Sequence, residues 1–122
     1  MKRTRHPLMM ASLLLALGSS SAQAASCAAM NALMAKYTKS SDAMDRETAR
    51  NKSMSNPPRY DTRVCKAARN TAKAIKKLMP SIAPGCFSSQ AAHSKAIDSL
   101  GSMWVHVAAV EGLSCAPGTR LY

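Results

Sequence analysis

The sequence lacks the short motifs that mark the common enzyme classes and metal-binding modules. Its four cysteines are far apart, so no Cys-x-x-Cys pair is present, which excludes the usual zinc-ribbon and thioredoxin-like spacings and c-type haem attachment. Gly-x-Ser-x-Gly, His-Glu-x-x-His and a phosphate-binding glycine loop are absent as well. His93 and Asp98 are five positions apart and share no helix face. We therefore expect a non-enzymatic protein that needs no cofactor or metal.

Acidic and aromatic residues are scarce. The sequence has six Asp and Glu residues but 17 Lys and Arg residues. Its aromatic residues are one Trp, three Tyr and one Phe. Large aliphatic residues are also few after the first 24 positions, so a small domain of this composition needs support beyond its apolar core. Tyr60 is the only ring near the densest run of cations, which makes nucleic acid an unlikely partner.

Residues 1–24 have the pattern of a cleavable export signal. A basic stretch, Met1 to His6, precedes the uncharged apolar run Leu8 to Leu17, and Ala22-Gln23-Ala24 offers the small-x-small pattern of a cleavage site. The apolar run is shorter than the roughly 20 residues of a membrane-spanning helix, which disfavours an N-terminal anchor. We predict cleavage after Ala24, or after Ala25 as the near alternative, leaving one domain, 25–122, in the periplasm or secreted.

A lipoprotein is a minor alternative. Ala24-Ala25-Ser26-Cys27 loosely resembles a lipobox, but the usual leucine at its first position is alanine. Lipidation of Cys27 would also leave an odd number of cysteines in an oxidising compartment. We therefore favour an unmodified Cys27.

Three helical segments, at about 26–52, 60–79 and 88–112, are expected, with no convincing strand. In the first, residues at alternating spacings of three and four form a heptad seam that should face partner helices. Asn56-Pro57-Pro58 then breaks the chain. The seam comprises Cys27, Met30, Met34, Tyr37, Ser41, Met44 and Thr48.

The second and third segments differ in polarity. On the second, an apolar face around Val64, Ala68, Ile75 and Leu78 opposes a basic arc that no acidic residue interrupts. The arc holds Arg59, Arg63, Lys66, Arg69, Lys73, Lys76 and Lys77. The third should start at a Ser88 or Ser89 cap, end near Gly112 and, being apolar almost all round, be the most buried.

The fold class predicted is an all-α, three-helix, up-down-up bundle held by two disulfides. Short loops favour antiparallel neighbours, which places Cys27 with Cys86 at one end and Cys65 with Cys115 at the other. Two other connectivities remain open if the topology differs. Each bridge is worth roughly 3 to 4 kcal/mol in the chain-entropy model.

Charge is the feature that points toward a function. The formal charge of +11, less the three Lys and Arg of the predicted signal, leaves +8 on the domain. A cationic helix face of this kind can contact anionic lipid headgroups or acidic polysaccharide. We expect a small exported binding or accessory protein that contacts such a surface through Arg63, Lys66, Arg69, Lys73 and Lys77.

Three other interpretations of these residues stay open. The basic arc can be the ordinary solvated exterior of a bundle helix. The chain can instead be a secreted membrane-perturbing effector, which requires the same helix to leave the bundle. A periplasmic copper-binding protein is the third interpretation, because thioethers suit monovalent copper and Met103 lies one turn from His106. It is the most remote of the three, because Met30, Met34 and Met44 fall on the seam and fit a core.

Overall fold

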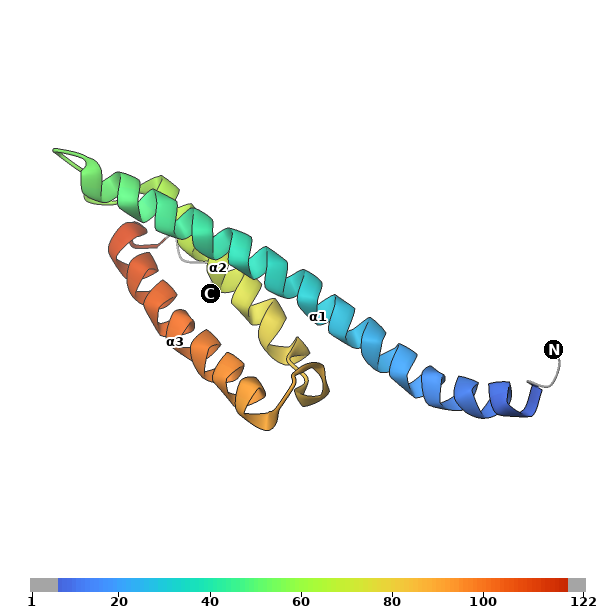
Figure 1. Cartoon of the computed structure of the whole chain (residues 1–122). Coiled ribbons are helices and arrows are strands. Elements are labelled where there is room, and N and C mark those ends of the chain that lie inside the picture. Colours follow the sequence, from blue (N-terminus) through green and yellow to red (C-terminus); the bar gives the residue numbers. More distant parts are fainter. Residues whose placement is uncertain (1–6, 119–122) are drawn as a thin grey trace.

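A computed structural model of the chain describes residues 7–118. Over this range it contains three α-helices, α1 (Pro7–Ser53), α2 (Thr62–Leu78) and α3 (Gln90–Ser114), and two short 3-10 helices, η1 (Met79–Ser81) and η2 (Pro84–Cys86). The helices run up, down and up (Figure 1), which confirms the predicted all-α bundle. Met1 to His6, the basic part of the predicted export signal, lie outside the described residues.

Helix α1 begins at Pro7, well before the expected start near residue 26. It runs without a break through the predicted cleavage site, and its N-terminal part extends beyond the bundle (Figure 1). The cause is the composition of this stretch, which is rich in the strong helix formers Leu, Ala and Met and has no proline between Pro7 and Pro57. Within residues 7–118, no helix is both long enough and apolar enough to cross a membrane.

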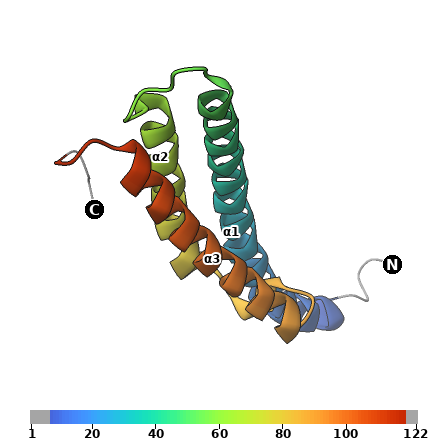
Figure 2. The ribbon, with the colours of Figure 1, turned by 90° about the vertical axis from the view of Figure 1, so that its left-hand side faces the viewer.

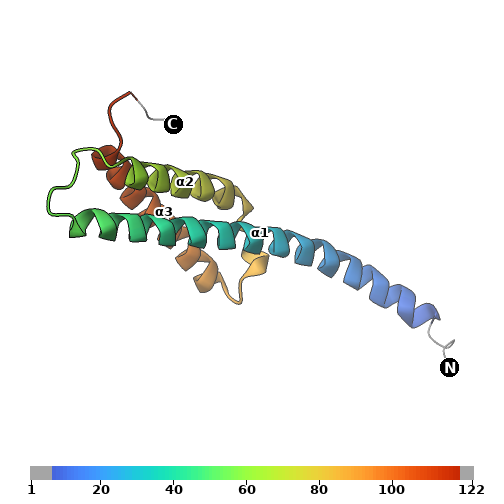
Figure 3. The ribbon, with the colours of Figure 1, turned by 90° about the horizontal axis from the view of Figure 1, so that it is seen from above.

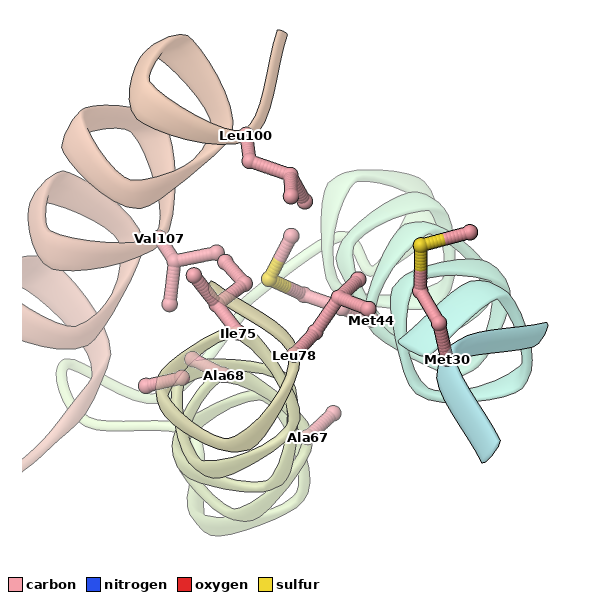
Figure 4. Packing of buried hydrophobic residues seen from close by; sticks show 9 residues of the cluster. Met30, Met44, Ala67, Ala68, Ile75, Leu78, Leu100 and Val107 are labelled. Carbon is pink, nitrogen blue, oxygen red and sulfur yellow. The ribbon is translucent and has the colours of Figure 1, made fainter. Parts of the chain in front are cut away.

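The core forms where the three helices meet. Met30 and Met44 of α1, Ile75 and Leu78 of α2, and Val107 of α3 point into one cluster (Figure 4). Every position of the predicted heptad seam is buried or half-buried, so the seam prediction is confirmed. Burying an aliphatic side chain of this size contributes about 1.5 to 3 kcal/mol.

The most buried helix is α2. The sequence predicted that α3 would be the most buried, and that prediction is wrong. Helix α2 buries Val64, Cys65, Ala67, Ala68, Thr71, Ala72, Ile75 and Leu78. Helix α3 buries Leu100, Val107 and Glu111, and leaves Val105 and Leu113 exposed. Because α3 crosses the other two helices at an angle (Figure 2), its apolar circumference exceeds the surface that its neighbours can cover.

The helix ends are set by side-chain caps and by a disulfide. The carboxylate of Asp61 accepts hydrogen bonds from the amides of Arg63 and Val64 and caps α2, and Ser89 caps α3 through the amide of Ala92. Helix α3 continues past Gly112, the predicted end, to Ser114. It does so because the amide of the disulfide-bonded Cys115 still donates to the carbonyl of Glu111.

Both predicted disulfides are present. Cys27 pairs with Cys86 and Cys65 pairs with Cys115, with Cα–Cα distances of 5.4 and 4.9 Å. The first ties α1 to η2 at one end of the bundle, and the second ties α2 to the end of α3 at the other. All four cysteines are oxidised, which indicates an exported protein of an oxidising compartment.

Candidate anion-binding groove

The five predicted anion-binding residues all lie on α2, but their surroundings differ. Arg63, Lys66, Lys73 and Lys77 are exposed, whereas Arg69 is half-buried. Helices α1 and α2 lie side by side and antiparallel (Figure 3), so the basic arc of α2 is bordered by α1 along one edge. The neighbouring helices therefore decide which of these cations an external anion can reach.

Arg63 is neutralised by a carboxylate of α1. Its Nη2 lies 2.9 Å from Oε2 of Glu47, whose Oε1 accepts from Nε of Arg50 at 2.7 Å. These contacts lower the pKa of Glu47, chiefly through the hydrogen bond from Arg50 and next through that from Arg63. Glu47 therefore stays ionised near neutral pH and reduces the attraction of Arg63 for another anion.

Arg69 faces the bundle interior. Its side chain is 17% exposed, and Nε lies 3.7 Å from Oε2 of Glu111, which is 5% exposed. The distance is an ion-pair contact too long for a hydrogen bond, and Arg69 Nε, Arg69 Nη2 and Glu111 Oε2 are buried without a hydrogen-bond partner. Arg69 thus contributes to packing between α2 and α3. The sequence prediction rested on the absence of acidic partners for the basic arc. That absence holds only within α2, because α1 supplies Glu47 to Arg63 and α3 supplies Glu111 to Arg69.

Three lysines of α2, Lys73, Lys76 and Lys77, share a cavity with lysines of α1. This cavity of about 520 Å³ lies between the two helices, and we call it the lysine groove. Leu33 and Ala74 give it an apolar part, and Ser40 and Asn70 add uncharged polar groups. Its cations are Lys36 and Lys39 of α1 and Lys73, Lys76 and Lys77 of α2. Among the described side chains, no carboxylate lines this cavity.

A second cavity continues the groove along the same two helices. It measures about 430 Å³ and shares Lys39, Ser40 and Asn70 with the lysine groove. Lys66 lines it further along, and the Glu47–Arg63 pair closes its far end. The net charge of the lining therefore changes along the two adjoining cavities. It is positive at the end where five lysines gather and close to zero at the end where Glu47 pairs with Arg63.

The reasoning from sequence missed Lys36 and Lys39. It considered the charges of one helix face, whereas the groove needs the antiparallel packing of two helices to bring Lys36 opposite Lys77. A signal was present, because Lys36 and Lys39 are three positions apart and therefore share the exposed side of α1. Combining that pair with the up-down topology would have indicated a two-walled site.

Lys73 and Asn70 also border a cavity on the adjacent flank of α2, which faces the end of α3. This cavity of about 440 Å³ is lined by Tyr60, Lys66, Arg69 and the Cys65 end of a disulfide, among others. Its most enclosed cation, Arg69, already faces Glu111. The lysine groove is therefore the better candidate for an anion.

The groups that would favour an enzyme or a metal protein are dispersed. His93 stacks edge-on against Phe87 at 5.5 Å, while His106 is exposed on α3, about 20 Å further along the helix axis at 1.5 Å per residue. Met30 and Met44 are buried in the core, as the seam interpretation expected. Within the described part of the chain, no group of three or more His, Cys, Asp or Glu side chains is arranged to hold a metal ion.

Comparison with known proteins gives no match to a family model, a curated protein or a solved structure. A helical bundle by itself fixes no activity, because unrelated functions share this architecture. The charge and shape of the lysine groove are therefore the basis for a functional proposal.

Proposed function

We propose that this chain is a small exported, non-enzymatic binding or accessory protein that holds anionic groups of its ligand in the lysine groove. One observation carries the proposal: lysines from two helices line one cavity, and its described lining includes no carboxylate. Cations facing one another across a concavity raise the local positive potential and concentrate anions there. An anion between the walls also relieves the repulsion among the lysines.

The exposure of these lysines sets the kind of ligand that can bind. An ion pair between exposed groups contributes about 0 to 1 kcal/mol, and salt screens it over about 8 to 10 Å. One anionic group therefore binds weakly, and useful affinity requires several contacts at once. The proposed ligand is multivalent, either an acidic polymer or an anionic surface, and its binding is sensitive to salt.

The alternatives receive less support from the geometry. A membrane-perturbing effector needs α2 to leave the bundle, but the apolar face of α2 is the most buried surface and Cys65 anchors α2 to Cys115. A copper protein needs several accessible thioethers close together, whereas Met30 and Met44 fill the core. Met103 and His106 do line one cavity on α3, but they bring only one thioether to it. The pattern of residues 1–24 and the disulfides support export to the periplasm or beyond.

Two triple variants that lose the same charge test the proposal. The groove variant carries Lys36→Gln, Lys39→Gln and Lys73→Gln, and the control carries Arg46→Gln, Lys52→Gln and Lys95→Gln at exposed positions outside the groove. Binding of fluorescent heparin to the oxidised protein is measured by anisotropy at 0.1 M salt. Three contacts of about 0.5 kcal/mol each predict a loss of roughly tenfold for the groove variant and a much smaller loss for the control. Equal losses in the two variants would overturn the proposal, and so would a parent protein that binds neither heparin nor anionic vesicles.

A further inference from the structure

We infer that the ligand of the lysine groove is an extended acidic polysaccharide lying along α1 and α2, rather than a membrane surface. The inference deepens the proposed function and rests on it. Its basis is the shape of the groove, the uncharged groups at its centre, and the position of the exposed apolar side chains of the molecule.

The groove has the shape of a channel for a chain. The lysine groove and the adjoining cavity share Lys39, Ser40 and Asn70, so together they form one elongated depression. It lies between α1 and α2, which run side by side and antiparallel in Figure 3. A linear polymer can follow such a depression and place successive anionic groups between the two walls. A flat bilayer meets only the outermost side chains and leaves the floor empty.

The centre of the channel offers hydrogen bonds as well as charge. Ser40 and Asn70 line both cavities and together supply hydroxyl and amide donors and acceptors. Sugar hydroxyls are donors and acceptors too, and they can pair with both side chains. Leu33, Ala43 and Ala74 are small apolar contacts suited to the C–H faces of sugar rings. A purely electrostatic ligand would use neither feature.

The exposed apolar side chains are in the wrong place for a membrane site. A helix that lies in a membrane interface needs an apolar face beside its cations. Among residues 23–118, whose side chains the structure describes, the large exposed apolar residues are Met54, Ile97, Val105 and Leu113, and none of them lines either cavity. The apolar face of α2 itself is enclosed in the core.

The far end of the channel limits how much of the polymer is held. Glu47 lines that end and is paired with Arg63 at 2.9 Å. A polyanion gains little beyond this point, because the Glu47–Arg63 pair carries no net charge to attract it. Affinity should therefore rise with oligosaccharide length until the chain spans the lysines, and then level off.

The test uses the oxidised protein and four probes: labelled oligogalacturonates of increasing length, polyphosphate, neutral dextran and phosphatidylglycerol vesicles. Expected are tighter binding with length up to a plateau, no binding to dextran, and little binding to vesicles. Asn70→Ala should weaken oligogalacturonate binding about threefold, the loss of one hydrogen bond of ordinary strength. It should weaken polyphosphate binding less, because polyphosphate has no hydroxyl groups along its chain to donate to the amide oxygen. Asn31→Ala, an exposed change on α1 outside the channel, should alter neither.

Each other outcome has a defined meaning. If vesicles bind and oligogalacturonates do not, the inference is overturned while an anion-binding groove remains. If oligogalacturonate and polyphosphate weaken equally on Asn70→Ala, or neither weakens, the sugar-specific contact is refuted. If no anionic probe binds, the proposed function and the inference both fail.

Discussion

The Nη2 of Arg50 lies 2.8 Å from each carboxylate oxygen of Asp61, which joins the last turn of α1 to the start of α2. The same carboxylate accepts from the Asn51 side chain at 3.0 Å and caps α2. One acidic residue thus closes the loop between the two helices. Because those helices are the walls of the lysine groove, their relative placement depends on this contact.

Removing the Asp61 carboxylate should destabilise the fold. Loss of an N-cap costs about 1 kcal/mol. Asp61→Ala also removes the partner of Arg50 Nη2, while Arg50 Nε stays bonded to Glu47, so we expect a total of about 2 kcal/mol. Asp61→Asn keeps a capping oxygen and should cost less. Urea unfolding measures both, with Asp98→Ala at an exposed position as the control. Equal stabilities for Asp61→Ala and the control would contradict the role assigned to this residue.

Acid should reduce the stability that the carboxylates of Asp61 and Glu47 contribute at the α1–α2 junction. The pKa of Asp61 is lowered, chiefly by the hydrogen bond from Asn51, and the pKa of Glu47 is lowered, chiefly by that from Arg50. A carboxylate whose pKa falls on folding stabilises the protein above its unfolded pKa near 4, and that contribution disappears as the pH falls through the folded pKa. The urea midpoint should therefore be flat from about pH 7 to 5.5 and decline below about pH 4.

A double variant isolates the two carboxylates in that decline. Asp61→Asn with Glu47→Gln removes both titrating groups, so its urea midpoint should fall less steeply in acid than that of the parent protein. An unchanged slope would assign the acid sensitivity to other groups.

Opening one disulfide should cost much of the stability. Cys65 and Cys115 are 50 residues apart, and the chain-entropy model gives about 4 kcal/mol for a loop of that length. Cys65→Ser with Cys115→Ser should lower the thermal midpoint strongly, as measured by far-ultraviolet circular dichroism. The Cys27–Cys86 bridge, whose ends are 59 positions apart, should give a similar loss. An unchanged midpoint in both variants would show that the packed core suffices alone.

The close approach of the helices depends on small side chains of α2. Ala68 is fully buried, so Ala68→Leu should destabilise the bundle by about 1 to 3 kcal/mol through overpacking. Met44→Ala should cost about 2 to 5 kcal/mol by leaving a cavity. Ala108→Leu on the exposed side of α3 is the matched control and should be nearly neutral in chemical denaturation.

Local periodicity predicted what a single helix determines. The heptad seam around Met30 and Met44 and the apolar face of α2 were both evident, and with short loops they implied the disulfide pairing. Properties that depend on two helices were not evident. The partners of Arg63 and Arg69 come from α1 and α3, and the second groove wall comes from Lys36 and Lys39.

The burial of helix α3 was also mispredicted, because it too depends on the neighbouring helices. Its apolar residues run almost all round, which is typical of a buried helix. Burial depends, however, on how many neighbours a small bundle can provide, and α3 packs chiefly against α2 on one side. Val105 and Leu113 therefore remain in solvent.

The two disulfides also determine how the domain responds to a pulling force. Along the chain, Cys65 lies between Cys27 and Cys86, and Cys86 lies before Cys115, so the two covalent loops overlap. Tension applied at the two ends enters at the Cys27–Cys86 bridge and leaves at the Cys65–Cys115 bridge. Three segments, 27–65, 65–86 and 86–115, connect these bridges in parallel and share the load. The shortest, 65–86, limits how far the bridges can separate, so α2, one wall of the groove, is the first helix to be fully extended.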